Sequence, residues 1–438
     1  MNKDIEFRYE DLVKKLFQLT PSFQNIGAEA YKPGLERTIE LQNICQVDLS
    51  KIPTIHIAGT NGKGSVSAIT ASWLQESGHK VGLFSSPHLI DFTERIRVNG
   101  IQMSHAFFIE FMDLYAEDIE HLKPSFFEVT TVMALKYFQE MKVDIAIMEV
   151  GLGGRLDSTN IINPLACVIT NIALDHTELL GNTLAEIAGE KAGIIKSNVP
   201  VIIGESTSET LPVFEAQSKR MGSKMILSEK VYSHWVGNYH QEGSFLTFET
   251  GDDQYKEILF KSTFGDLSMI SNVRTALTLF DEIAVAFHAN IDDFLVGLLN
   301  TPKNTGFRGR WEQLSNSPRI IIDTAHNANG MKKVVAMANV VRSTTGGHVH
   351  FFLGMAKDKD VKSVLQELPD DFIYHFSAPS NPRGLEAEKL QLMASENKLK
   401  GDVVSDIHQW IELHGSTLGS TDFILIAGSN FLIADFLK

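Results

Sequence analysis

Cysteine is scarce in this sequence, and its scarcity excludes two kinds of site. The chain has 438 residues but only Cys45 and Cys167, and neither stands in a metal-type spacing. A disulfide framework and a cysteine zinc site are therefore not expected. Long hydrophobic runs are also missing. A membrane span needs about 18 consecutive apolar residues, and no stretch of the sequence is that long. The charged start MNKDIEFRYEDL has no apolar core, unlike a signal peptide. We therefore expect a soluble cytoplasmic protein with no membrane partner.

Basic residues are fewer than acidic ones. Lys and Arg number 39 against 54 Asp and Glu, which gives a formal net charge of −15. Nucleic acid is not expected as the main partner, because affinity for it comes from clustered Lys and Arg. An anionic small substrate stays compatible with this balance, since a few local cations decide its binding. With 43% hydrophobic residues, the chain can bury a core, and its length suggests two or three domains of about 100–200 residues each.

A glycine-rich stretch near residue 60 has the layout of a phosphate-binding loop. The apolar run Ile52–Ala58 predicts a buried strand, and Val66, Ile69 and Trp73 follow with helical spacing. A loop between strand and helix attracts anions through its backbone N–H groups, and a lysine adds charge. The standard pattern is matched imperfectly, and a plain glycine-rich turn is the alternative. We predict a nucleotide phosphate site formed by Gly59, Thr60, Asn61, Gly62, Lys63, Gly64 and Ser65.

Short apolar runs alternate with helical patterns along the chain, which predicts an α/β fold. We expect a larger N-terminal domain of mostly parallel sheet over residues 1–300, with a hairpin or meander at 231–262. Residues 301–310 contain Pro, Gly and Asn without a period, so we place a domain linker at 301–309. Strands and helices then alternate again from a first strand at 319–323, which predicts a smaller α/β domain over 310–438.

Polar residues follow several predicted strands of the N-terminal domain. Glu149 ends one strand, and Asp175 and His176 follow the next. Ligands sit beyond the carboxyl ends of strands in α/β sheets, which would also bring Ser86 from the polar loop 85–100 towards the phosphates. A carboxylate there can ligate Mg²⁺, whereas a helix cap or a structural hydrogen bond is the alternative. Lys191 lies in a helical pattern and, judged by its residue type alone, belongs on a solvated helix face.

The predicted second domain carries its own polar cluster. Arg310 follows the linker, and Asp323 and His326 stand where the strand at 319–323 ends. Arg can pair with phosphate, Asp can accept from a ribose, and His can meet a carboxylate. The alternative is a capping Asp with an Asn at a helix start. Ser429 opens the last predicted helix, which makes a second possible anion site.

Ten stretches of the chain together resemble one family, in the same order. The family is folylpolyglutamate synthase and the bifunctional dihydrofolate synthase/folylpolyglutamate synthase, relatives of the Mur ligases. The resemblance implies a Mur-ligase-like ATPase domain with a mostly parallel sheet, followed by a smaller Rossmann-like domain. The stretches are IHIAGTNGKGS, SSPHLIDFTERIRVNG, SFFEVTTVMALKYF, MEVGLGGRLDSTN, ITNIALDHTELLGNT, EKAGIIK, GRWE, IDTAHN, LGMAKDKD and GSN.

The resemblance also implies roles for single residues. Lys63, His176 and Lys191 would take part in catalysis, and Lys191 matches a lysine that is carbamylated in the family. The loop Gly59–Ser65 would bind ATP. The metal positions are matched by Ser86, Glu149 and His176. The remaining matches are Asn272, Arg310 and Asp323 for the nucleotide; Ser125, Phe126, Phe127, Glu128 and Asp157 for the pterin; and His326 and Ser429 for glutamate. The chain departs from the family at Ser85 and around Ser429, where Asn430 and Phe431 follow.

The expected activity is ATP-dependent addition of L-glutamate to dihydropteroate or to a reduced folate, through an acyl phosphate. ATP, Mg²⁺ and, as a further option, a monovalent cation are the cofactors that the resemblance implies, and the chain is expected to act as a monomer. Two alternatives stay open: a Mur-type ligase acting on a UDP-sugar precursor, and a nucleotide-dependent switch without ligase activity. The sequence leaves undecided which folate is preferred, how many glutamates are added and whether Lys191 is modified.

Overall fold

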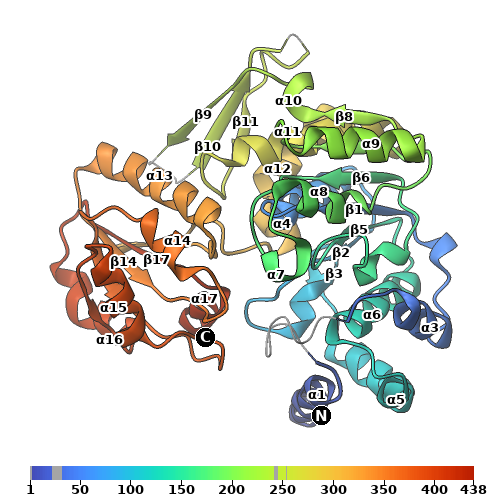
Figure 1. The fold of residues 1–438 in the computed structure, drawn as a ribbon, viewed down its shortest axis with the longest axis horizontal. Coiled ribbons are helices and arrows are strands. Elements are labelled where there is room, and N and C mark those ends of the chain that lie inside the picture. Colours follow the sequence, from blue (N-terminus) through green and yellow to red (C-terminus); the bar gives the residue numbers. More distant parts are fainter. Residues whose placement is uncertain (1, 22–31, 241–244, 253) are drawn as a thin grey trace. The chain divides into compact units, whose positions relative to one another are not determined.

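The chain folds into two compact units, shown in Figure 1. The computed structural model describes residues 2–21, 32–240, 245–252 and 254–438. Unit 1 comprises Met1–Val236, Glu249–Phe260 and Ile270–Phe307, and unit 2 comprises Gly237–Phe248, Lys261–Met269 and Arg308–Lys438. The chain thus passes between the units near residue 307 and also within the stretch 237–269.

Unit 1 is built on an eight-stranded sheet in the order β4-β3-β2-β5-β1-β6-β7-β8. All neighbours from β2 to β8 run parallel, while β3 is antiparallel to both β2 and β4. This confirms the predicted mostly parallel α/β sheet. The strands are β1 (Thr54–Ala58), β2 (Val81–Phe84), β3 (Ile96–Val98), β4 (Ile101–Gln102), β5 (Ile145–Glu149), β6 (Ala166–Ile169), β7 (Val201–Ile203) and β8 (Met225–Leu227).

The loop predicted at 85–100 contains regular structure that the sequence pattern did not reveal. It holds the short helix η3 (Phe92–Arg95) and β3, and β4 follows it. These strands are two or three residues long and mix polar with apolar side chains, so they give too few positions for a period to be recognised. The sheet therefore extends by two antiparallel strands beyond β2.

Helix α4 (Lys63–Glu76) follows the phosphate loop and is buried along most of its length. The predicted apolar face of Val66, Ile69 and Trp73 is completely buried, which confirms that part of the sequence analysis. Helix α12 (Ile291–Thr305) packs closely on α4, because a Cβ added at Gly297 would lie only 2.5 Å from Trp73 Cα. The small side chains of these two helices thus allow their backbones to approach.

Helix α12 includes the first residues of the predicted linker, so the expectation that 301–305 lies outside a helix was wrong. Pro302 suggested a break, but it lies in the last turn of a helix that other contacts hold. Thr301 Oγ1 donates to Gly297 O at 2.8 Å, and Asn304 Nδ2 donates to Ser72 Oγ at 3.0 Å. Tertiary contacts to α4 therefore outweigh the local effect of the proline.

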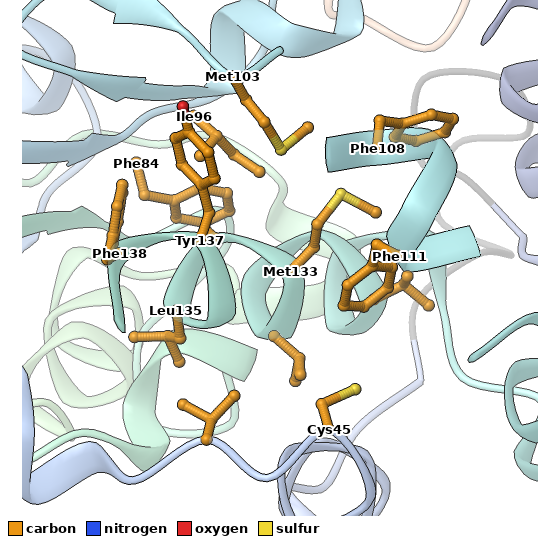
Figure 2. Close-up of a cluster of buried hydrophobic side chains, with 14 of the residues drawn as sticks. Cys45, Phe84, Ile96, Met103, Phe108, Phe111, Met133, Leu135, Tyr137 and Phe138 are labelled. Carbon is orange, nitrogen blue, oxygen red and sulfur yellow. The ribbon is translucent and has the colours of Figure 1, made fainter. Parts of the chain in front are cut away.

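A large apolar cluster lies where α6 (Phe126–Met141) faces β2 and the neighbouring helices (Figure 2). Phe84, Met133 and Phe138 are fully buried there, and Phe108 and Phe111 enter from α5 (His105–Leu122). Burial of each large apolar side chain stabilises the fold by about 1.5–3 kcal/mol. This cluster fixes α6, whose first turn carries the predicted pterin residues. The other helices here are α1 (Asn2–Leu19) and α3 (Glu36–Ile44).

The remaining helices of unit 1 precede or follow a small sheet, whose strands lie in the stretch where the chain passes between the units. The small sheet has three strands in the order β11-β10-β9, where the sequence predicted a hairpin or meander. Its strands are β9 (Trp235–His240), β10 (Phe245–Thr250) and β11 (Phe260–Ser262). The helices are α7 (Thr177–Leu180), α8 (Leu184–Ala192), α9 (Leu211–Met221), α10 (Ser228–Val231) and α11 (Met269–Ile283); the short 3-10 helices are η2 (Leu49–Lys51), η4 (Ser158–Ile161) and η5 (Ala284–Phe287).

Unit 2 contains a six-stranded sheet in the order β12-β13-β17-β14-β15-β16. Only β12 is antiparallel to its neighbour among these strands. The strands are β12 (Glu312–Asn316), β13 (Arg319–Ile322), β14 (Val349–Leu353), β15 (Ile373–Phe376), β16 (Gly401–Val403) and β17 (Phe423–Ala427). The helices are α13 (Ala328–Thr345), α14 (Val361–Gln366), α15 (Ala387–Glu396), α16 (Ile407–His414), η6 (Gly415–Thr417) and α17 (Asn430–Leu437).

The first strand of the six-stranded sheet is therefore β12, and the prediction that the strand at 319–323 begins this part of the chain was wrong. The sequence EQLSN of β12 is polar because this edge strand is mostly solvent-accessible, so it lacks the apolar run by which the other strands were found. Across the part of the chain that is described, no helix combines the length and apolar character needed to cross a membrane.

Candidate active site

The predicted phosphate loop follows β1, which lies between β5 and β6 in the sheet of unit 1. Gly59 has φ +148, and a Cβ there would overlap Thr170 Oγ1. Gly62 has φ +86 and precedes the first residue of α4. Both positions therefore require glycine, because each has a positive φ that other residues rarely adopt and because a Cβ would overlap a neighbouring side chain.

The loop is held by the segment that follows β6. Thr60 N donates to Asn171 O at 2.9 Å, and Asn61 N donates to Asn171 Oδ1 at 2.9 Å. Thr170 Oγ1 in turn donates to Asn61 O at 2.6 Å. The N–H groups of Thr60 and Asn61 are thus used inside the protein, and the donors suited to phosphate are those of the first turn of α4, which lack helical acceptors.

Lys63 lies in that first turn and folds back over the loop. Its Nζ donates to Gly59 O at 3.0 Å and to Thr60 O at 3.2 Å. Ser65 is buried at 2% exposure. Asn272, a predicted nucleotide residue from α11, lies directly at the loop, since a Cβ on Gly62 would overlap Asn272 Oδ1. The structure therefore brings Lys63, Ser65 and Asn272 together, as the sequence analysis expected.

Glu149 lies on the other side of Gly64. It ends β5, is 3% exposed, and both carboxylate oxygens lie 3.8 Å from the position of a Cβ added to Gly64. Ser86 N donates to Glu149 Oε2 at 3.2 Å. Two of the three predicted metal positions, Ser86 and Glu149, are therefore adjacent to each other and to the loop.

This donor set fits a hard divalent cation. The described residues hold no group of three or more His, Cys, Asp or Glu side chains suited to a metal. Mg²⁺ is commonly held by one or two carboxylates together with waters and substrate phosphates, and a buried carboxylate beside a phosphate loop matches that arrangement. His176, the third predicted position, has φ +51 at the start of α7, and its Nε2 lies 3.8 Å from Asp175 Oδ1.

Lys191 is buried, so the expectation of a solvated helix face was wrong. It is 4% exposed on α8 because the glycine-rich loop after β5 covers that helix: a Cβ on Gly154 would lie 2.8 Å from Glu190 O and 3.0 Å from Lys191 Cα. Burial, together with the nearby charge of Lys63, lowers the pKa of Lys191 to about 7, although Asp175 and Asp157 act in the opposite direction. A substantial fraction of this amine is therefore neutral near pH 7.

The predicted pterin residues have structural contacts of their own. Ser125 and Glu128 form a capping box at the start of α6, and Glu128 also pairs with Arg37 at 3.1 Å. Phe126 stacks on Phe17 with ring centroids 4.6 Å apart. These contacts explain the conformation of the helix start and leave a substrate role of the three residues as a prediction.

Asp157 and Phe127 meet at Gly151. Asp157 Oδ2 accepts from Gly151 N at 3.0 Å and from Leu152 N at 2.9 Å. A Cβ on Gly151 would lie 2.5 Å from the Phe127 ring. Burial raises the pKa of Asp157, while its hydrogen bonds act against that rise. The aromatic ring and the carboxylate thus meet at one glycine-rich turn.

The predicted residues of unit 2 gather where β13 and β17 end side by side. Asp323 Oδ2 accepts from Trp311 N and Asp323 Oδ1 from Ala325 N, each at 2.8 Å. Burial raises the pKa of Asp323 to about 6, although Arg310 lowers it in part. Arg310 and Asp323 are therefore electrostatically coupled.

His326 and Ser429 lie on the two loops of this edge. His326 Nδ1 lies 3.0 Å from Thr324 O, so a neutral ring would carry its proton on Nδ1. Ser429 accepts from Phe431 N at 3.1 Å as the cap of α17, and Gly428 N donates to Ala325 O at 3.0 Å. The latter bond ties together the loops that carry the two predicted glutamate residues.

Sequence reasoning missed several residues that shape these sites. We did not predict roles for Asn171, Glu205 and Arg95, because none of them forms a recognisable motif with its sequence neighbours. Arg95 is 3% exposed, donates from Nε to His88 Nδ1 at 2.8 Å and interacts electrostatically with Glu149. The one available signal was its place in SSPHLIDFTERIRVNG, where Arg95 and Arg97 flank Ile96.

Comparison with protein families defines the class. Residues 57–279 match the Mur ligase middle domain, and residues 309–430 match the Mur ligase glutamate ligase domain. The chain belongs to the Mur ligase family.

Within that class, the chain belongs to the dihydrofolate synthase/folylpolyglutamate synthase family. It is 33% identical over 417 residues to the Bacillus subtilis enzyme of that name, covering 93% of this chain and 95% of the relative. The structure of E. coli FolC in complex with DHPP and ADP has 27% identity and a TM-score of 0.81, covering 98% of this chain and 96% of that chain. A bifunctional folylpolyglutamate synthase/dihydrofolate synthase with Mn, AMPPNP and L-glutamate bound has 26% identity and a TM-score of 0.74, covering 93% and 94%.

Proposed function

We propose that this protein is an ATP-dependent ligase that adds L-glutamate to dihydropteroate or to a reduced folate. The observation that carries the proposal is the assembly of Gly64, Glu149 and Ser86 beside Lys63, in a chain that aligns with dihydrofolate synthase/folylpolyglutamate synthase over 93% of its length. A relative's structure holds Mn, AMPPNP and L-glutamate, which are the ligands that such a reaction needs.

The reaction has two steps. A substrate carboxylate oxygen attacks the γ-phosphorus of ATP, the bond to the bridging oxygen breaks, and ADP leaves with the electron pair. The amine of L-glutamate then attacks the acyl carbon, phosphate leaves, and the amine loses a proton as the amide forms. Phosphoryl transfer depends mainly on positioning and charge neutralisation.

The residues of unit 1 supply that positioning. The N–H groups at the start of α4 hold the phosphates, and Lys63 offsets the charge that develops on the γ-phosphate. Glu149 and Ser86 would hold a divalent cation, with His176 as a further ligand. When bound, such a cation draws negative charge from the phosphate oxygens.

We also propose that Lys191 is carbamylated. A neutral amine nitrogen attacks the carbon of CO₂ and loses a proton, which leaves a carbamate anion. The burial of Lys191 and its pKa of about 7 support this step, because an ordinary lysine is almost entirely protonated at neutral pH. The resulting anion would face the nearby charge of Lys63.

The other predicted residues would bind the substrates. Phe127 and Asp157 would hold the pterin, with Ser125, Phe126 and Glu128 supporting it from the start of α6. Unit 2 would contribute Arg310 and Asp323 to the nucleotide, and His326 and Ser429 to the incoming glutamate. We also propose that the protein acts as a monomer.

An ADP-release assay tests the proposed function. The protein is incubated with ATP, Mg²⁺ and L-glutamate, in parallel with dihydropteroate, with a reduced folate and with a UDP-sugar peptide. We expect release of ADP that needs glutamate together with one or both of the first two acceptors. Release stimulated only by the UDP-sugar peptide would indicate the cell-wall alternative, and release that depends on no acceptor would indicate a nucleotide switch. Either outcome would contradict the proposal.

A further inference from the structure

Glu205 joins the two sides of the phosphate loop. It follows β7, and its N–H donates to Thr170 O at 2.9 Å. One carboxylate oxygen, Oε2, accepts from Asn171 Nδ2 at 3.4 Å, and the other, Oε1, accepts from Ser271 Oγ at 2.5 Å. Asn171 and Ser271 come from distant parts of the sequence, and each leads to the loop.

On one side, Glu205 sets the orientation of the Asn171 amide. An ionised carboxylate only accepts hydrogen bonds, so the NH₂ of Asn171 must face it. Asn171 Oδ1 then faces the loop and accepts from Asn61 N at 2.9 Å. If the amide were reversed, its NH₂ would meet the N–H of Asn61, which is a repulsive pair of donors.

On the other side, Glu205 fixes the start of α11. Ser271 lies in its first turn, and the next residue, Asn272, has its Oδ1 so close to Gly62 that a Cβ there would overlap it. The bond from Ser271 to Glu205 therefore determines where Asn272 meets the loop. Both contact points, at Asn61 and at Gly62, depend on the same carboxylate.

We infer that Glu205 is a positioning residue for nucleotide binding. It acts through Asn171 and Ser271 and holds the loop in the conformation that presents the N–H groups of α4 to the phosphates. The inference rests on the proposed nucleotide site, but it does not depend on which acceptor the ligase uses.

The test exchanges the hydrogen-bonding roles of Glu205 and Asn171. In Glu205→Gln, the new amide can turn its NH₂ towards Asn171, which reverses the Asn171 amide, or towards Ser271 Oγ, which removes the acceptor of the Ser271 hydroxyl. Either orientation breaks one of the two hydrogen bonds that Glu205 accepts. We expect the Kd for ADP and the KM for ATP to rise about tenfold, the usual consequence of one mispaired buried hydrogen bond. The KM for the folate acceptor should stay close to that of the unchanged protein, and the melting temperature should fall by only a few degrees. Glu209→Gln, an exposed change in the same connection, is the matched control and should leave the Kd for ADP unchanged.

The double variant Asn171→Asp with Glu205→Gln provides the rescue. The new carboxylate accepts both from Asn61 N and from the Gln NH₂, while the Gln oxygen accepts from Ser271. We expect its Kd for ADP to return to within about threefold of the unchanged protein, whereas Asn171→Asp alone places two carboxylates side by side and weakens ADP binding. A double variant that binds ADP no better than the weaker single variant would overturn the inference.

Direct ADP binding separates this inference from the proposed function. A protein that binds ADP but ligates no glutamate contradicts the proposed function and leaves the role of Glu205 intact. If Glu205→Gln fails to fold, Ser271→Ala removes only one hydroxyl from the half-buried start of α11 and must still raise the Kd for ADP. Normal ADP binding by a folded Glu205→Gln or by Ser271→Ala would overturn the inference.

Discussion

At the scale of single residues, a few buried or half-buried charged side chains determine the electrostatics of the proposed phosphate site. Lys63 and Lys191 interact with each other through space, and burial deprives Lys191 of the solvation that would keep it protonated. Glu149 and Asp157 are buried carboxylates of unit 1, at the end of β5 and in the loop that follows it. Opposite charges thus replace water around the proposed phosphate site, as catalysis by fixed charges requires.

Replacing Lys63 tests the charge on the phosphate loop. We expect Lys63→Ala to lower kcat by at least about 100-fold, because a positive charge aimed at the transferred phosphate is lost. The melting temperature should hardly change, since Lys63 is only partly buried and its side chain bonds to carbonyl groups of its own loop. A folded Lys63→Ala protein with near-normal turnover would contradict the assignment of the loop. Lys219→Ala, at the end of α9, serves as the control for loss of a lysine elsewhere.

The pH dependence of Lys191 modification is a second prediction for one residue. The pKa of Lys191 is lowered to about 7, so the reactive neutral amine is present above that pH and is lost as the pH falls through it. We expect isotope-labelled bicarbonate to give a carbamate signal by NMR that grows as the pH rises through this range. The signal should be missing in Lys191→Arg. A carbamate that forms only at strongly alkaline pH would show that Lys191 behaves as an ordinary lysine.

At the scale of helices and strands, the close contact between α4 and α12 depends on Gly297, which has no side chain. A Cβ at Gly297 would lie 2.5 Å from Trp73 Cα and 2.6 Å from Trp73 N, and neither is a flexible atom. We expect Gly297→Ala to lower the free energy of unfolding by about 1–3 kcal/mol, the usual cost of overpacking. The expected change is a lower melting temperature.

At Gly189, in another helix of unit 1, we expect substitution by alanine to stabilise the protein, in contrast to Gly297→Ala. A Cβ at Gly189 would meet nothing within 4 Å, and the residue lies inside α8 without positive φ. Gly189→Ala should therefore raise the free energy of unfolding by about 0.5–1 kcal/mol, since alanine loses less backbone entropy in a helix. Equal effects of the two substitutions on the melting temperature would contradict this account of the α4–α12 contact.

The elements also show what sequence patterns can and cannot predict. Strands β1, β5, β6 and β17 were predicted because they are apolar over most of their length. Strand β12 was missed because it is a polar edge strand, and the burial of Lys191 was missed because a distant glycine-rich loop covers it. The pairing of Glu205 with Asn171 and Ser271 could not be predicted, since it depends on three segments that meet only in the folded protein.

At the scale of the whole molecule, the proposed function assigns a nucleotide contact to Arg310 of unit 2. Arg310 is coupled to the buried Asp323, whose pKa is raised to about 6. We expect Arg310→Ala to lower kcat/KM for ATP by about tenfold or more, the loss typical of a hydrogen bond to a charged group. Arg342→Ala, which removes a pair with Asp371 elsewhere in unit 2, should change it less than about twofold, as surface ion pairs contribute little. Equal values for both variants would exclude unit 2 from the nucleotide site.

In the proposed reaction, the loop Gly59–Ser65 presents the γ-phosphate of ATP to a substrate carboxylate. This step can be tested directly with dihydropteroate or a reduced folate whose carboxylate is labelled with heavy oxygen, incubated with ATP and L-glutamate and followed by mass spectrometry of the released phosphate. We expect one labelled oxygen in each released phosphate. The carboxylate oxygen that attacks the γ-phosphorus stays bonded to it and leaves in the phosphate when the amide forms. Phosphate without the label, released as amide accumulates, would contradict the proposed reaction.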